Sequence, residues 1–92
     1  MDIATHFGRN LARARRHAGL SQEELGVRAT LHRTEIGLLE RGERVPRIDT
    51  VIKVAGALSI SATELIEGIR WSPGRTTAGS FSVEPEKEDE PA

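Results

Sequence analysis

The fold is decided by residues 21–46, which read SQEELGVRATLHRTEIGLLERGERVP. Ser21 and Glu24 have the spacing of a capping box, in which each side chain bonds the backbone N–H of the other residue, so a helix is expected to begin here. This helix is short, and a second short helix is expected over residues 33–40, with Gly42 ending it. Two short helices joined by a tight turn therefore form the centre of the predicted fold.

The chain before this stretch predicts one longer helix. Apolar residues recur there at steps of three and four, the period of one helix face. They are Ile3, Phe7, Leu11, Ala14 and Ala18. Arg9, Arg13 and Arg16 lie off this stripe. Gly19 can end the helix in the left-handed conformation, and Leu20 would supply the apolar contact that accompanies such an end.

Two further helices are expected after Pro46. The fourth carries apolar residues at helical spacing, namely Ile48, Val51, Ile52, Ala55 and Leu58. Ser61 and Glu64 have the spacing of a second capping box, which is expected to open a fifth helix that runs through Ile69. The prediction is an all-α, compact five-helix domain over residues 1–70.

The composition changes at Trp71. Residues 71–83 contain Pro and Gly and are expected to form a C-terminal extension, in which the alternation from Ser80 to Val83 is typical of a short strand. Residues 84–92 are acidic, carry two prolines and hold too little apolar area to order themselves. A disordered acidic tail is therefore expected.

The formal net charge of −1 is divided unevenly along the chain. Residues 1–70 hold 11 Lys and Arg against 9 Asp and Glu, a net of +2, whereas residues 71–92 hold 2 against 5, a net of −3. A mildly basic body permits nucleic-acid binding, and a clustered basic face would argue for it. There are no cysteines, which excludes disulfides and thiolate metal sites. No run reaches the roughly 18 apolar residues of a membrane span, so we expect a cytoplasmic protein without a membrane contact.

About residues 7–69 resemble the Cro/cI-type helix-turn-helix domain of the Xre family of phage and bacterial regulators. The resemblance is carried by Leu20-Ser21-Gln22-Glu23-Glu24-Leu25, by Ile36-x-x-Leu39-Glu40-x-Gly42, by Pro46, and by the run from Thr50 to Leu65. It implies a lambda-repressor-like domain that binds double-stranded DNA sequence-specifically, with the helix at 33–40 in the major groove and the preceding helix across the backbone. The expected function is a cytoplasmic, nucleoid-associated transcriptional regulator that acts as a repressor.

Two contacts are expected to hold the recognition helix. Apolar residues of the two short helices must meet across the turn and fix the angle between them; these residues are Leu25, Ala29, Ile36 and Leu39. The resemblance also implies a partly buried ion pair between Arg15 and Glu40. This pair would lock the reading helix to the scaffold, so we assign both residues to architecture.

The resemblance further implies which residues touch DNA. Arg33 and Thr34 occupy positions that face base edges. Arg can bond guanine O6 and N7 as a fork, and Thr can meet a thymine methyl group. Gly37 and Leu38 lie one turn further along the same face, where Gly37 would let backbones approach and Leu38 would meet a thymine methyl group or stay exposed.

Phosphate contacts are expected around this face. Gln22 matches the family's phosphate-binding Gln at the start of the second helix. Arg41 and Arg44 follow the recognition helix as flanking clamps, with Arg9 and Arg47 as weaker candidates. Such contacts set register and affinity rather than sequence choice. For each of these side chains the alternative is an ordinary solvated surface residue.

Three residues depart from the family pattern. The family usually has Gly in the turn where Thr30 stands, so Thr30 is expected to be strained or the turn to differ. Gly26 stands where Ala is usual, which costs roughly 0.5–1 kcal/mol. His32 stands where Ser or Thr usually caps the recognition helix, so a poorer cap is expected.

Enzymatic chemistry is not indicated. His6, His17 and His32 are scattered without metal-ligand spacing, and the chain has no nucleophile motif and no Gly-rich phosphate loop. His6 and His17 are expected at the surface. We expect no cofactor and no metal.

The alternative function is a protein-interaction module on the same fold, such as an antitoxin or an adaptor. Residues 71–83 would then bind a partner protein through Trp71 and the strand-like segment, or else fold back on the domain. A homodimer is expected because one short recognition helix reads only a few base pairs. The fifth helix with Ile69 and Trp71 is the first choice for its interface.

Overall fold

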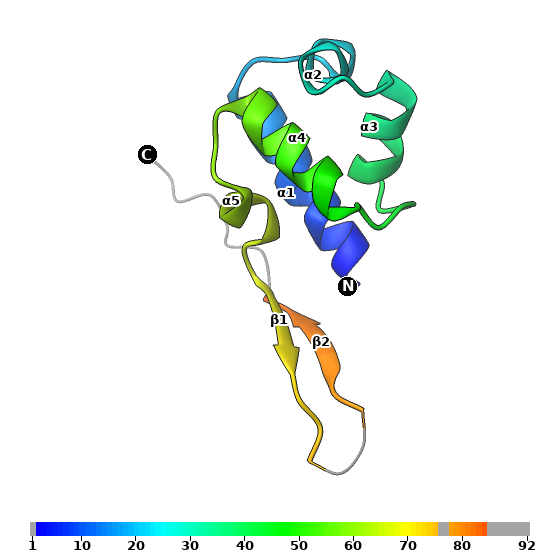
Figure 1. The fold of residues 1–92 in the computed structure, drawn as a ribbon, viewed down its shortest axis with the longest axis vertical. Helices are drawn as coiled ribbons and strands as arrows, with labels where there is room; N and C mark the ends of the chain where they lie inside the picture. The colour runs from blue at the N-terminus through cyan, green and yellow to red at the C-terminus, as the bar shows by residue number, and fades with distance from the viewer. Residues whose placement is uncertain (1, 76–77, 85–92) are drawn as a thin grey trace.

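A computed structural model describes residues 2–75 and 78–84 of the chain. The five predicted helices are present, and a two-stranded hairpin extends from them (Figure 1). The elements are α1 (Ile3–His17), α2 (Gln22–Ala29), α3 (Arg33–Glu40), α4 (Ile48–Leu58), α5 (Ala62–Ile66), β1 (Ile69–Ser72) and β2 (Ser80–Val83). None of the helices in the described residues is long and apolar enough to cross a membrane. The acidic tail expected at 84–92 lies, apart from Glu84, outside the described residues.

Local caps fix where the first two helices begin and where the first ends. Asp2 Oδ1 accepts from the Thr5 N–H at 2.8 Å. Ser21 and Glu24 form the predicted capping box, with both reciprocal bonds at 3.0 Å. The Ser21 N–H lowers the pKa of the exposed Glu24 carboxyl. Gly19 ends α1 in the left-handed conformation at φ +74°, so α2 starts after a short, well-defined connection.

The turn between α2 and α3 contains a left-handed residue that is not glycine. Thr30 occupies it at φ 58° and ψ 44°, a conformation that costs an L-residue roughly 1–2 kcal/mol.

Gly26 does more than lower the stability of α2, which is all that the sequence predicts for it. Its carbonyl accepts from the Leu31 N–H at 2.8 Å, and a Cβ on Gly26 would lie 2.6 Å from the Leu31 carbonyl oxygen. The turn therefore folds so closely on α2 that a side chain is excluded there. His32 caps α3, because its Nδ1 accepts from the Thr34 N–H at 3.1 Å.

The core joins all five helices. Its most deeply buried side chains are Phe7, Leu11, Leu25, Ile36, Leu39, Val54 and Leu65. The contact expected between α2 and α3 lies within this cluster. Gly8 lets α1 approach α3, since a Cβ there would lie 2.7 Å from the Glu40 carbonyl oxygen. α3 is thus backed by α1 and α2, which leaves its remaining face open.

The apolar stripe predicted on α4 is partly wrong. Ile48 and Ile52 are 76% and 60% exposed. The residues that α4 buries are Thr50, Val51, Val54, Ala55 and Leu58. These form one face at helical period, and Ile48 and Ile52 fall beside it. Their side chains therefore remain on the surface of the described chain.

The fifth helix is shorter than the sequence predicts. The Ser61 Oγ accepts from the N–H two residues on, at 3.2 Å, and the described residues show no reciprocal bond from Glu64, so the second capping box is wrong. α5 ends at Ile66. Gly68, at φ +86°, turns the chain, and Ile69 begins β1 instead of continuing the helix. The domain boundary expected at residue 70 therefore falls inside a strand.

β1 and β2 pair antiparallel beside the start of α1. The register pairs Ile69 with Val83, Arg70 with Ser82, Trp71 with Phe81, and Ser72 with Ser80. His6 Nε2 donates to the Glu67 carbonyl at 2.7 Å, and Asn10 Nδ2 donates to the same oxygen at 3.1 Å. His6 is buried, so its expected surface position is wrong, because the chain folds back over this turn of α1. His17 is exposed, as predicted.

Candidate nucleic-acid interface

The C-terminal end of α3 is anchored to α1 by a two-point ion pair. Arg15 Nε lies 2.6 Å from Glu40 Oε2, and Arg15 Nη2 lies 2.9 Å from Glu40 Oε1. The two side chains are 13% and 7% exposed. The hydrogen bonds to Glu40 raise the pKa of Arg15, against the opposing effect of burial. Arg15 Nη1 also donates to the Leu20 carbonyl at 2.8 Å, so one side chain ties α3 to the α1–α2 connection.

Gln22 joins the same network. Its Nε2 donates to Glu40 Oε1 at 3.1 Å, and its side chain is half-buried. An amide nitrogen carries two hydrogens, so one remains for another acceptor such as a phosphate oxygen. The sequence assigns Gln22 to DNA and Glu40 to architecture, whereas the structure brings both into one hydrogen-bonded cluster.

The first turn of α3 is open to solvent. Arg33 and Thr34 are exposed, and Leu38 lies half-buried one turn further along the helix. Thr34 and Leu38 are four positions apart and lie on one face of the helix, and Arg33 borders that face at the first helical position. This face offers a cation, a hydroxyl with its methyl group, and an apolar side chain, which are the kinds of group that contact base edges in a major groove.

Gly37 lies beside this face but is buried. A Cβ on Gly37 would lie 2.9 Å from Arg41 Nη1 and 3.8 Å from Gln22 Oε1. The missing side chain therefore leaves room for the Arg41 guanidinium, and the Gln22 side chain lies within ordinary contact distance of the same point. Three residues that the sequence assigns to DNA thus meet at one place.

The arginines of the loop between α3 and α4 have acidic neighbours. The pairs are Arg41 with Glu43, Arg44 with Glu35 at 3.5 Å, and Arg47 with Asp49 at 3.3 Å. More than half of each arginine side chain is exposed. Exposed pairs of this kind are worth about 0–1 kcal/mol, so each arginine can exchange its carboxylate for a phosphate at little cost. Sequence reasoning located Arg41 and Arg44 but missed these partners.

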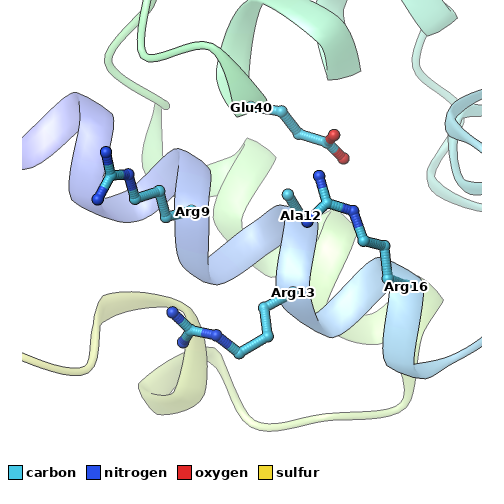
Figure 2. Close-up of a pocket in the computed structure, with 5 residues that line it drawn as sticks. All are labelled: Arg9, Ala12, Arg13, Arg16 and Glu40. Carbon is cyan, nitrogen blue, oxygen red and sulfur yellow. The ribbon is translucent and has the colours of Figure 1, made fainter. Parts of the chain in front are cut away.

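A basic groove runs between α1 and the C-terminal end of α3. It has a volume of about 360 Å³ and is lined by Arg9, Ala12, Arg13, Arg16 and Glu40 (Figure 2). Figure 2 shows the three arginines on α1 and Glu40 on the neighbouring α3. Because Arg15 neutralises Glu40, guanidinium groups dominate the groove. Sequence reasoning did not assign Arg13 and Arg16 to the site, although their spacing from Arg9 along one helix is a usable signal.

The side chains of α3 and of the loop that follows it are suited to binding polar ligands. Among residues 2–75 and 78–84, no group of three or more His, Asp or Glu is arranged to hold a metal ion. The open face of α3 and the surrounding loop present guanidinium, hydroxyl and amide donors. Such donors bind phosphate oxygens and base edges.

The chain is similar to several known proteins in sequence and in fold. The helix-turn-helix family model (HTH_3) matches residues 11–65. The chain is 41% identical over 66 residues to an uncharacterized HTH-type transcriptional regulator of Sinorhizobium fredii, covering 72% of this chain and 86% of that protein. It is 41% identical over 76 residues to control protein C.SmaI of Serratia marcescens, covering 80% of this chain and 90% of that protein. The crystal structure of the restriction-modification controller protein C.AhdI from Aeromonas hydrophila is similar at a TM-score of 0.66 and 39% identity, covering 67% of this chain and 94% of that one.

Proposed function

Since the chain belongs to the helix-turn-helix family of DNA-binding transcription regulators, we propose that α3 lies in the major groove of double-stranded DNA and reads a specific sequence there. The contrast between the two sides of α3 carries this proposal. Glu40 ties one side to α1 and α2, whereas Arg33 and Thr34 are exposed on the other. A helix held in one orientation, with a polar and exposed first turn, has the geometry that groove reading requires.

Arg33 and Thr34 are the proposed base readers. The Arg33 guanidinium would bond guanine O6 and N7 as a fork, and Thr34 would contact a thymine methyl group or bond a base edge through its hydroxyl. Leu38, half-buried one turn on, would add a second methyl contact. The choice of sequence would therefore rest on the first half of α3.

The proposed phosphate contacts surround these readers. Gln22 would use its remaining amide hydrogen, and Gly37 would serve by leaving room for the Arg41 guanidinium. Arg41 and Arg44 would exchange their carboxylate partners, the exposed Glu43 and the half-buried Glu35, for phosphate oxygens of the flanking DNA backbone. These contacts would set the position of α3 and the salt dependence of binding.

Two copies of the chain would bind each site. One short helix reads only a few base pairs, and a two-fold pair reads half-sites about 34 Å apart, one turn of the duplex. The protein would act on chromosomal DNA in the cytoplasm, at the nucleoid, and would repress a promoter that its site overlaps.

The decisive experiment is selection of bound fragments from genomic DNA, followed by salt titration on the best site. We expect an enriched, two-fold symmetric sequence. The logarithm of the binding constant should fall linearly with the logarithm of the salt concentration. If no sequence is enriched, specific DNA reading is wrong, and the protein-interaction alternative, an antitoxin or adaptor on the same fold, takes its place.

A narrower second candidate is control of restriction-modification genes. The similarity to the restriction-modification controller protein C.AhdI, at 39% identity over 94% of that chain, favours it. The selected DNA site should then lie upstream of genes for a restriction enzyme or its methyltransferase. A site elsewhere would leave general transcription regulation in place and remove this narrower role.

A further inference from the structure

The basic groove between α1 and the end of α3 presents three exposed guanidinium groups that the proposed DNA contacts of α3 do not use. Arg9, Arg13 and Arg16 are spaced four and three residues apart, so they follow one face of α1 (Figure 2). Glu40, which also lines the groove, is 7% exposed and is paired at two points with Arg15. The groove therefore carries a net positive charge and is suited to an anionic ligand.

The row of arginines has the length of a short extended peptide. Arg9 and Arg16 are seven residues apart, which is about 10 Å along a helix axis. An extended chain advances about 3.3–3.6 Å per residue, so four or five residues span this row. Arg13, in the middle, is held by the buried Asn10, whose Oδ1 accepts from Arg13 Nη1 at 3.3 Å. Guanidinium groups pair well with carboxylates, so an acidic peptide in extended form fits the groove.

The chain carries such a peptide directly after Glu84, the last residue that the structure describes. Residues 85–92 hold four acidic residues against one lysine, a net charge of −3. The acidic residues are Glu86, Glu88, Asp89 and Glu90. The first and the last of them are four residues apart, about 13–14 Å in an extended chain. Residues 86–90 therefore match the row of arginines in length and oppose it in charge.

The described chain ends beside the same face of α1. Glu84 N donates to the Gly68 carbonyl at 2.8 Å. A Cβ on Gly68 would lie 2.7 Å from His6 Nε2 and 3.6 Å from Glu84 Cβ, so Glu84 stands beside His6. His6 precedes Arg13 by seven residues, which puts the two on one helix face about 10 Å apart. Residues 86–90 can therefore reach the groove without any change in the fold.

We propose that residues 86–90 dock in the basic groove, where their carboxylates pair with Arg9, Arg13 and Arg16. Exposed ion pairs are individually weak and are screened by salt. Attachment to the same chain compensates for this weakness, because a short tether gives an effective concentration on the order of millimolar. Docking is therefore an equilibrium that a competing polyanion can displace.

The docked segment would lower the affinity for DNA of any sequence. This consequence rests on the proposed DNA-binding function, whereas the docking itself does not. The groove lies at the end of α3, so phosphates of a duplex beside α3 would compete with residues 86–90 for the same arginines. The arginines set affinity and not sequence choice, so the competition would weaken binding to random and to preferred DNA alike.

Docking can be measured in the full chain because the sequence has no cysteine. Ala92→Cys allows a nitroxide label to be attached beyond the acidic residues, and NMR then measures the broadening of each backbone amide signal. Without DNA, broadening should be strong along residues 9–16 of α1 and weak in α2, which lies far from the hairpin (Figure 1). At 1 M salt the screening length falls to about 3 Å, so broadening at residues 9–16 should fall at least threefold. Broadening there that does not change with salt would overturn the proposal.

Charge variants separate docking from mere proximity of the label. Replacing the four acidic residues with their amides (Glu86→Gln, Glu88→Gln, Asp89→Asn and Glu90→Gln) keeps the length of the segment and should reduce broadening at residues 9–16 at least threefold. Arg13→Gln should reduce it at least twofold. Arg28→Gln, at an exposed position on α2, is the matched control and should leave it unchanged. Circular dichroism should show the same helix content in each protein. Equal broadening with the acidic and the amide segment would contradict docking.

DNA binding separates this inference from the proposed function. At low salt the amide variant should bind a random duplex at least threefold more tightly than the wild type, and Arg13→Gln should reduce that gain. A gain that Arg13→Gln leaves unchanged would mean that the segment acts through overall charge, and competition at the groove would be wrong. If the wild type binds no DNA, the DNA-reading proposal fails, while the broadening still decides docking. If broadening ignores the segment's charge and Arg13→Gln weakens DNA binding, the groove belongs to DNA and docking fails alone.

Discussion

Arg15 on α1 and Glu40 on α3 lie 25 residues apart in the chain, and their side chains meet in a two-point ion pair at 2.6 and 2.9 Å. The same carboxylate accepts a hydrogen bond from Gln22 at the start of α2. One side chain thus joins three helices behind the proposed reading face. The orientation of α3 depends on this junction, so its loss should affect both stability and DNA binding.

Glu40→Ala should destabilise the fold by about 3–5 kcal/mol, because it leaves the Arg15 guanidinium partly buried without its partner. In a chain of this size each kcal/mol lowers Tm by roughly 4–8 °C. Thermal unfolding followed by circular dichroism measures the change. The control is Glu43→Ala, which removes one partner of an exposed pair and should cost less than about 1 kcal/mol. If Glu40→Ala and Glu43→Ala melt at the same temperature, the pair of Arg15 and Glu40 does not anchor α3.

Arg33→Ala should relax sequence choice, and Arg44→Ala should not. Loss of the Arg33 fork should cost about 1–3 kcal/mol on the preferred site and reduce discrimination at one base pair. Loss of Arg44 should weaken binding to all sequences and lower the salt slope by about 1. Competition binding at several salt concentrations separates the two effects. Lys53→Ala, on the exposed side of α4, is the charge-matched control, and a loss as large as that of Arg33→Ala would show that only overall charge matters.

Thr30→Gly should stabilise the protein by about 1 kcal/mol. The left-handed conformation at φ 58° is costly for Thr and free of that penalty for Gly, which outweighs the entropy that Gly loses on folding. Urea unfolding measures the gain in the free energy of unfolding, provided that its dependence on urea concentration is the same in both proteins. Val27→Gly, at an exposed position inside the same helix, should instead destabilise by roughly 0.3 kcal/mol, the difference in helix propensity between Val and Gly. A loss of stability in both variants would mean that Thr30 is not strained.

Gly26→Ala and Gly56→Ala should act in opposite directions. A Cβ on Gly26 would press against the Leu31 carbonyl oxygen at 2.6 Å, so the turn must shift, at a cost of about 1–3 kcal/mol. A Cβ on Gly56 in α4 meets nothing within 4 Å, so Ala there should stabilise by roughly 0.5–1 kcal/mol. Chemical denaturation of the two variants tests the pair. Stabilisation of both would mean that the turn tolerates a side chain.

The capping box should make stability depend on acid pH. The Ser21 N–H lowers the pKa of Glu24 in the folded chain below its value in the unfolded chain. The stabilisation from this carboxylate is therefore fully present above the unfolded pKa and is lost as the pH falls through the folded pKa. Glu24→Gln keeps an acceptor for that N–H without titrating. The stability difference between wild type and Glu24→Gln should favour the wild type at neutral pH and shrink on acidification.

Glu23→Gln is the control for this pH series, because Glu23 is an exposed carboxyl in the same first turn. Subtracting its profile removes the general effect of net charge. A difference for Glu24→Gln that does not change between neutral and acid pH would contradict the assigned role of the capping box.

Local patterns predicted the helices because helix ends depend on residues a few positions apart. Ser21 and Glu24 mark the start of α2, and the bounds of α3 at residues 33–40 agree with the prediction. The same logic failed at Ser61, where the right spacing produced a cap without the reciprocal bond. There α5 has only five residues, because the chain turns at Gly68 and His6 on α1 bonds the Glu67 carbonyl, and this second contact is not local.

What the sequence by itself determined is the helix order, the position of the recognition helix and, through family resemblance, the partnership of Arg15 with Glu40. Only the tertiary structure decided which surfaces are free. It buries His6 under the chain that follows α5, leaves Ile48 and Ile52 exposed, and pairs Arg44 with Glu35. The physical reason is that caps and periodicity act over three or four residues, whereas burial and charge pairing depend on segments that folding brings together from distant parts of the chain.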